Sequence, residues 1–224
     1  MLKKSRATPW KSGKVISICL RNGVYILAQM VREPYLVFFN HFNEENTWEG
    51  VTLKEEDILF CKAVTRQFLR YSPVAIIKEV NPLLDYELPK EWIYSHIGGH
   101  NITISVKGRE RQVVGFGQRC SLVLADKDSG QPEDNPLMGL FQSYIISDIK
   151  EQDWDRVGQA EFMSIEVFPT LNERLYLCFL YGKNINPEQD ISLGKPLLDD
   201  YETYIDILTN SPEARHLYLG EYEE

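Results

Sequence analysis

The sequence predicts an α+β fold that is mainly antiparallel β-structure. We expect a small bent sheet or partly open barrel at the N-terminus and a second antiparallel sheet with a C-terminal amphipathic helix. Three short apolar runs within residues 13–42 are separated by turn residues, more runs of strand length follow, and a helical repeat appears after Pro196. Short apolar runs bounded by Gly or Pro favour strands over buried helices.

The three N-terminal runs predict a meander. They span Val15–Leu20, Val24–Val31 and Tyr35–Phe39 and are rich in β-branched and aromatic side chains, which suit a pleated surface. Asn22-Gly23 lies between the first two runs, and this pair adopts the positive φ angles of a tight hairpin turn at little steric cost. Pro34 marks the next boundary because it has no N–H to give to a ladder.

The segment after the meander is expected to complete an N-terminal domain over residues 1–95. Val51–Cys61 is expected to form a short helix or turn that leads into a strand, and another strand is expected over Val74–Val80. Pro89–Tyr94 predicts a short helix or 3₁₀ segment, because proline suits a first helical turn. Trp48 lies in a polar loop and is expected to fold back on the core.

Residues 96–224 are expected to form a second, acidic α+β domain. The apolar run Arg174–Tyr181 is predicted to be the central strand of its sheet. Further strands are predicted over Ile102–Val106, Gln112–Phe116, Ser121–Ala125 and Phe162–Phe168.

A single amphipathic helix is predicted near the C-terminus, between Pro196 and Asn210. Its apolar face has side chains at helical spacing, namely Leu197, Tyr201, Tyr204, Ile205 and Leu208. Another face carries Asp199, Glu202 and Asp206, and this acidic stripe is either a solvated surface or a ridge for the basic side chains of a partner.

Charge is distributed unevenly along the chain. Residues 1–112 carry 16 Lys and Arg against 12 Asp and Glu, a net charge of +4, whereas residues 113–224 carry 8 against 21, a net charge of −13. Phosphate would be repelled by the acidic half, so we expect no direct contact with nucleic acid. The acidic half either only keeps the protein soluble, or it attracts a basic protein partner and raises the rate of association.

The composition favours a cytoplasmic protein without a membrane span. No apolar run approaches the roughly 20 residues that cross a bilayer, and no apolar stretch follows the basic first residues as in a signal peptide. The four cysteines show no zinc spacing and are expected to be buried thiols in a reducing compartment. They are Cys19, Cys61, Cys120 and Cys178.

No motif predicts a metal, a cofactor or a catalytic centre. The sequence has no GxSxG nucleophile elbow and no GxxxxGK[ST] phosphate loop. His96 and His100 are four residues apart, but Gly98-Gly99 argues against a helix that would present both to a metal. The acidic loop Asp126–Pro136 resembles a calcium loop only in composition, since the ligand register of an EF-hand is absent.

The N-terminal residues resemble a known family. The resemblance rests on Lys11-x-Gly13-Lys14-Val15-x-Ser17-Ile18-x-Leu20-x-Asn22-Gly23-x-Tyr25 and, after an apolar strand, Leu36-Val37-Phe38-Phe39. This order is similar to the start of the immunity protein 26 family, bacterial proteins encoded beside polymorphic toxins. Phe68–Val80 and Pro89-x-x-Trp92 also fit the layout of that family, so the resemblance covers residues 11–95. It implies a cytosolic protein that binds and neutralises a cognate toxin, and it carries over no functional residues.

The resemblance and the charge distribution together lead to a hypothesis about function. We expect a non-enzymatic immunity protein that occludes a cognate toxin domain, a basic nuclease fitting best, through its acidic half. The residues expected to contact the toxin are Asp148, Glu151, Asp153, Asp155, Asp199, Glu202 and Asp206.

Two other interpretations of the sequence are open. The first is a regulatory or ligand-binding β module with a pocket lined by Trp48, Trp92 or Trp154. The second, a hydrolytic enzyme, is less well supported, because the carboxylates lie in polar stretches where little burial is expected to shift their pKa.

Overall fold

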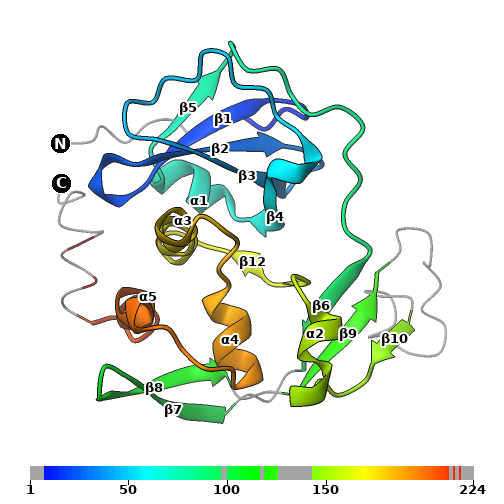
Figure 1. Ribbon diagram of the computed structural model, residues 1–224, viewed down its shortest axis with the longest axis vertical. Coiled ribbons are helices and arrows are strands. Elements are labelled where there is room, and N and C mark those ends of the chain that lie inside the picture. The colour runs from blue at the N-terminus through cyan, green and yellow to red at the C-terminus, as the bar shows by residue number, and fades with distance from the viewer. Residues whose placement is uncertain are drawn as a thin grey trace. The chain divides into compact units, whose positions relative to one another are not determined.

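The meander predicted from the sequence begins the larger sheet of the protein, sheet A (Figure 1). In the computed structural model, β1 (Val15–Cys19), β2 (Tyr25–Met30) and β3 (Tyr35–Asn43) pair antiparallel in chain order. Asn22 and Gly23, in the 3₁₀ turn between β1 and β2, have φ angles of 60° and 74°. The prediction of a hairpin turn with positive φ at both positions is therefore confirmed.

The structure describes residues 8–96, 100–116, 119–125 and 143–211, together with Ala214 and Leu217. The chain divides into two compact units, each discontinuous in sequence. Unit 1 comprises residues 1–87, 164–186 and 199–224, and unit 2 comprises residues 88–163 and 187–198. The acidic loop Asp126–Pro136 lies outside the described residues.

Sheet A belongs to unit 1 and has six strands in the order β12-β4-β3-β2-β1-β5. Strand β5 (Val74–Ile77) confirms a predicted strand, and helix α1 (Arg66–Tyr71) connects it to β4 (Ile58–Val64). Strand β4 begins earlier than expected, because Ile58–Cys61 was predicted to belong to a short helix or turn before the strand. Strand β12 (Ile165–Glu166) pairs with β4 in the parallel direction, whereas the other pairs are antiparallel. The sheet is open, with β12 and β5 at its edges, so it does not close into a barrel.

Helix α3 (Thr170–Tyr181) corrects one prediction, because the run Arg174–Tyr181 was expected to be a strand. The helix contacts β3, the β1–β2 turn and helix α5. All residues from Leu171 to Cys178 are buried, so the run shows no polar stripe from which a helical repeat could be recognised. Gly182, in the left-handed conformation, caps its C-terminus.

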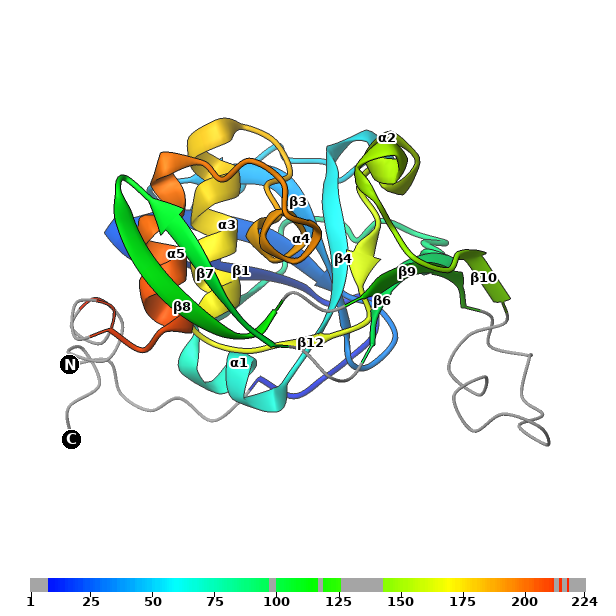
Figure 2. The same ribbon diagram turned by 90° about the horizontal axis from the view of Figure 1, so that it is seen from below.

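The C-terminal helix is shorter than predicted. A 3₁₀ turn, η4 (Asp199–Tyr201), precedes α5 (Glu202–Leu208), which lies beside α3 in Figures 1 and 2. The predicted apolar face is confirmed in part, because Tyr201, Tyr204 and Ile205 are buried, whereas Leu197 precedes the helix and belongs to unit 2. Asn210 follows the helix with a φ of 55°. Unit 1 also contains the 3₁₀ turn η2 (Glu55–Asp57), before β4.

Unit 2 is built on a four-stranded sheet, sheet B, in the order β10-β9-β6-β11. Its strands are β6 (Glu91–Ser95), β9 (Cys120–Leu124), β10 (Ser143–Ile146) and β11 (Glu161–Phe162). The short helical segments η3 (Glu151–Asp153) and α2 (Trp154–Val157) and the helix α4 (Pro187–Leu193) complete the unit with the hairpin of β7 (His100–Val106) and β8 (Arg109–Phe116).

Strand β6 corrects a second prediction, because Pro89–Tyr94 was expected to be helical. Trp92 and Ile93 instead pair with Val123 and Leu122 of β9. Aromatic and β-branched side chains suit this half-buried strand, and cross-strand packing outweighs the local signal of the proline. The bounds of the predicted element lie within two residues of those of β6, but its type was wrong.

The compact units differ from the expected division into residues 1–95 and 96–224. The first boundary falls at residue 87, close to the expected one, but residues 164–186 and 199–224 return to unit 1. The physical reason is that unit 1 needs these segments, because β12 extends sheet A and α3 packs against β3. Of the helices that the structure describes, none is long and apolar enough to cross a membrane.

Buried charged side chains fix the returning segment against sheet A. Arg21, in the β1–β2 turn, donates two hydrogen bonds of 2.9 and 3.0 Å to Glu173, whose side chain is 0% exposed. Lys62 of β4, also fully buried, donates to Ser164 Oγ at 3.0 Å and lies 3.4 Å from a carboxylate oxygen of Glu166. Each pair joins a residue of the first 87 to one after residue 163.

We predict that Arg21→Ala lowers the free energy of unfolding by about 3 kcal/mol, because the Glu173 carboxylate stays buried without its guanidinium. Chemical denaturation measures the change. Lys54→Ala, which removes the exposed partner of Glu56, serves as the control and should leave the stability almost unchanged. A loss below about 1 kcal/mol for Arg21→Ala would show that this pair does not hold the segment.

Candidate functional site

Four of the predicted contact residues lie on one short segment of unit 2. Glu151 and Asp155 are exposed, and Asp148 and Asp153 are partly exposed. The segment is anchored by Ile149 and Val157, which are buried in the apolar core of the unit with Leu122 and Phe162, and Trp154 packs against this core. We call residues 148–155 the acidic segment.

Two basic side chains beside the acidic segment are already engaged. Lys150 Nζ lies 2.9 Å from Asp148, and the Lys150 backbone N–H donates to Asp153 Oδ2 at 2.9 Å. Arg156 donates two hydrogen bonds, of 2.8 and 2.9 Å, to Glu91, and these bonds lower the pKa of the Glu91 carboxyl. The two most exposed carboxylates, Glu151 and Asp155, have no such salt bridge within 4.0 Å among the described residues.

The other three predicted contact residues belong to unit 1. Asp199 is exposed and Glu202 is partly exposed, but Asp206 is only 8% exposed. The expectation that Asp206 lies on an exposed acidic stripe is therefore wrong. The buried side of α5 includes Asp206 as well as Tyr204 and Ile205. The exposed polar face of the helix is therefore narrower than the sequence spacing indicates.

The acidic half of the sequence does not form one acidic unit. Unit 1 carries 15 Lys and Arg against 20 Asp and Glu, and unit 2 carries 9 against 13. The reason is that residues 199–224, which hold a net charge of −7, belong to unit 1. The structure thus brings Asp148, Glu151, Asp153 and Asp155 together on one segment and assigns Asp199, Glu202 and Asp206 to the other unit.

Of the three tryptophans expected to line a ligand pocket, Trp154 borders a pocket and the other two are buried. Trp48 and Trp92 are buried in the cores of their units, and the prediction that Trp48 folds back on the core is confirmed. Their indole N–H groups donate locally, to Asn46 Oδ1 and to the Pro89 carbonyl. Trp154 borders an open pocket of about 430 Å³ in unit 2, where the ammonium group of Lys195 lies 5.8 Å from the ring centroid.

His96, one of the two histidines considered as metal ligands, forms a hydrogen bond to a residue of sheet B. His96 Nε2 lies 2.7 Å from Ser121 Oγ, and Ser121 donates to the Ser147 carbonyl at 2.7 Å. Burial and the nearby Arg119 lower the pKa of His96. Within the described residues no group of three or more His, Cys, Asp or Glu side chains could hold a metal ion.

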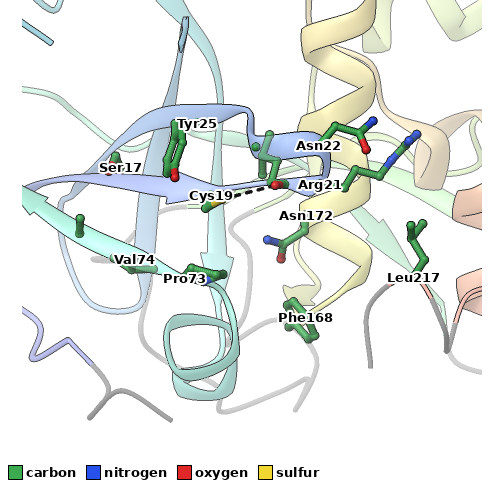
Figure 3. A pocket seen from close by; sticks show the side chains of 13 residues that line it. Ser17, Cys19, Arg21, Asn22, Tyr25, Pro73, Val74, Phe168, Asn172 and Leu217 are labelled. Carbon is green, nitrogen blue, oxygen red and sulfur yellow. Dashed lines mark hydrogen bonds between the residues drawn. The ribbon is translucent and has the colours of Figure 1, made fainter. Parts of the chain in front are cut away.

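A pocket of about 410 Å³ lies at the β1–β2 turn of unit 1 (Figure 3). Strand β1, the turn and the start of β5 form one part of its wall, and Phe168 and Asn172 of the returning segment form another. Its volume is within the range of small-molecule sites. Ser17, which belongs to the pattern that resembles the immunity protein 26 family, is one of the lining residues.

Ser17 is the unusual residue of this pocket. Its side chain is buried, with 1% of the residue exposed, yet its hydroxyl makes no hydrogen bond to any part of the chain that the structure describes. A buried hydroxyl without a partner costs roughly 1–3 kcal/mol, so native proteins seldom retain one. Ser17 pairs with Leu27 and Ala75 across the neighbouring strands, which places it between β2 and the edge strand β5.

Cys19 and Tyr25 face each other beside Ser17. They are paired in the β1–β2 register, and Figure 3 shows the Tyr25 hydroxyl directed toward the thiol. The interaction with Cys19 is the main cause that raises the pKa of Tyr25. Cys19 Sγ also donates to the Leu20 carbonyl at 3.4 Å.

The part of the wall formed by the β1–β2 turn is polar, and the charge of Arg21 there is neutralised by Glu173. The Arg21 guanidinium is bonded to Glu173 and lies 3.6 Å from the ring centroid of Tyr176. Asn22 Nδ2 donates to the Tyr176 hydroxyl at 2.8 Å. Sequence reasoning used Asn22 only as a turn residue and did not find this pocket, because Phe168 and Asn172 follow some 150 residues later and no local pattern links them to the turn.

Comparison with known proteins yields one family. A family model described as "Domain of unknown function (DUF8309)" matches residues 5–117, half of the chain. The match includes every strand of sheet A except β12. No curated protein and no solved structure matches the chain.

We predict that a thiol reagent modifies one cysteine of the native protein rapidly. Cys19 is partly exposed, whereas Cys61, Cys120 and Cys178 are buried, and burial raises the pKa of Cys120 to about 11. The buried thiols should react only through local unfolding. Counting modified thiols in the native and guanidinium-unfolded protein should give one and four. Rapid labelling that persists in Cys19→Ser would contradict the assignment.

Proposed function

Since the chain belongs to the DUF8309 family, whose description assigns no activity, we propose that it is a binding protein of the immunity class. It would bind and occlude a cognate toxin domain, with a basic nuclease as the best-fitting toxin. The resemblance of residues 11–95 to the immunity protein 26 family supports the class of function.

One structural observation supports the choice of the acidic segment as the toxin-binding surface. The acidic segment presents four carboxylates within eight residues, and its apolar side chains are anchored in the core of unit 2. Anchoring reduces the entropy lost when a partner binds, since the backbone that carries the carboxylates is already ordered. A basic toxin surface complements such a segment, and complementary charge raises the association rate.

A nuclease is favoured because of its own substrate. An enzyme that holds a phosphate backbone needs a positively charged groove, which binds nucleic acid with release of the counterions condensed on the phosphates. Carboxylates that enter the groove would compete with nucleic acid directly. Occlusion of this kind needs no catalytic group in the immunity protein.

We predict that replacing both exposed carboxylates of the segment with lysine, as Glu151→Lys with Asp155→Lys, slows association with the toxin about tenfold at low salt. The toxic domain encoded by an adjacent gene is the binding partner to use. The salt dependence of the association rate should flatten, because the steering charge is gone. Stopped-flow or surface-plasmon measurements at several salt concentrations report both effects.

The matched control is Glu44→Lys with Glu45→Lys, which makes the same charge change at two exposed positions of unit 1. This control should bind and protect cells as the parent protein does. The variant Asp199→Lys with Glu202→Lys, measured in parallel, reports whether the exposed carboxylates of unit 1 contribute to toxin binding. If the variant of the acidic segment protects cells as well as the control does, the proposed surface is wrong.

A further inference from the structure

The pocket at the β1–β2 turn offers a site that is independent of the acidic segment. Among the lining residues that the structure describes, the only charged side chain is Arg21, and that guanidinium is compensated by Glu173. An ion entering this pocket would lose hydration without gaining an uncompensated partner, which costs free energy. The walls therefore favour an uncharged occupant over an anion or a cation of the same shape.

Two hydrogen-bonding groups of the wall are not used within the part of the chain that the structure describes. The Ser17 hydroxyl has no partner among the described residues. Asn172 Oδ1 accepts a hydrogen bond of 2.9 Å from Ser72 Oγ, and in the described part of the chain its Nδ2 donates to no acceptor. A hydroxyl can accept or donate, and an amide nitrogen donates, so the two groups complement a ligand that carries both an acceptor and a donor.

The rest of the wall is apolar or aromatic. Figure 3 shows the ring of Tyr25 on the strand side of the pocket and the ring of Phe168 near the start of α3. Pro73 and Val74 add an apolar surface at the beginning of β5. Apolar and aromatic walls with a few placed polar groups are typical of sites for small planar molecules.

We propose that this pocket binds an uncharged planar molecule that carries both a hydrogen-bond acceptor and a donor. Aromatic amides and nucleobases share this chemistry. Ser17 and Asn172, which lie on different walls of the pocket, bind the polar groups of the ligand, and the apolar wall packs against its ring. The site explains why a buried hydroxyl is retained without a partner of its own, and it goes beyond the proposed toxin binding, because it lies in unit 1.

The test uses three probes of the same shape and different charge. The full chain, labelled with ¹⁵N, is titrated with benzamide, benzoate and benzamidinium, and amide chemical shifts are followed. Benzamide should shift the resonances of residues 17–25, and the two ions should bind at least about tenfold more weakly. Adenosine and uridine, titrated in the same way, distinguish a nucleobase ligand from a simple amide.

Variants separate binding from folding. Ser17→Ala should weaken benzamide about fivefold, the effect of one neutral hydrogen bond. The melting temperature of the free protein should stay the same or rise, because the unpaired hydroxyl is removed. Ala75→Trp, at the exposed position paired with Ser17, should block the pocket, whereas Ile76→Trp, exposed on the next residue of the same strand, should not.

The proposal is overturned by any of three results. Benzamide leaves the resonances of residues 17–25 unchanged, an ion binds as tightly as benzamide does, or Ser17→Ala and Ala75→Trp bind it as the parent protein does. None of these results depends on a toxin. A failure here therefore leaves the immunity proposal standing, and the loss of toxin binding would not remove this site.

Discussion

Unit 1 depends on charged side chains that are buried between sheet A and the segment that returns to it after residue 163. Glu173 receives Arg21 from the β1–β2 turn, and Lys62 of β4 lies between Ser164 and Glu166. Arg174 is buried as well, with its guanidinium carbon 3.7 Å from the ring centroid of Phe60. A buried charge that loses its partner is strongly destabilising, so we infer that these pairs select one register for α3 against the sheet.

The same constraint creates the pocket. Asn172 lies next to Glu173 in α3, so the ion pair that fixes Glu173 against Arg21 also sets Asn172 beside the turn. Asn22, which follows Arg21, bonds to Tyr176 one helical turn further along. The pocket is thus formed where the family-matched part of the chain meets a segment outside the match. Both segments are needed to form the wall of the pocket, and neither segment forms it alone.

Local patterns predicted the elements whose signals are local. Asn22-Gly23 and Pro34 delimited the meander correctly, because turn chemistry depends on the residues themselves. The strands β7, β8 and β9 were also predicted, and the turn between β7 and β8 falls at Lys107-Gly108, both of which have positive φ. The antiparallel α+β class followed from these strands.

Elements that depend on long-range packing were not predicted. Helix α3 is buried at every position from Leu171 to Cys178, so its apolar residues have no period that distinguishes helix from strand. Asp206 looked exposed at helical spacing but lies buried, and Ser17 looked like an ordinary strand residue but lines a pocket. Neither position could be recognised without knowing which distant segment covers it. The candidate site was therefore predictable only in part, as the four carboxylates of the acidic segment.

The two proposals assign different roles to the two units. Unit 2 presents carboxylates on an anchored segment for a protein partner, and unit 1 holds a neutral pocket for a small molecule. Hydrogen–deuterium exchange of the protein with and without the toxic domain tests the central claim most directly. The account predicts that the toxin slows exchange across residues 148–157 and leaves residues 44–49 unaffected. Slowed exchange confined to other segments, with residues 148–157 unchanged, would contradict it.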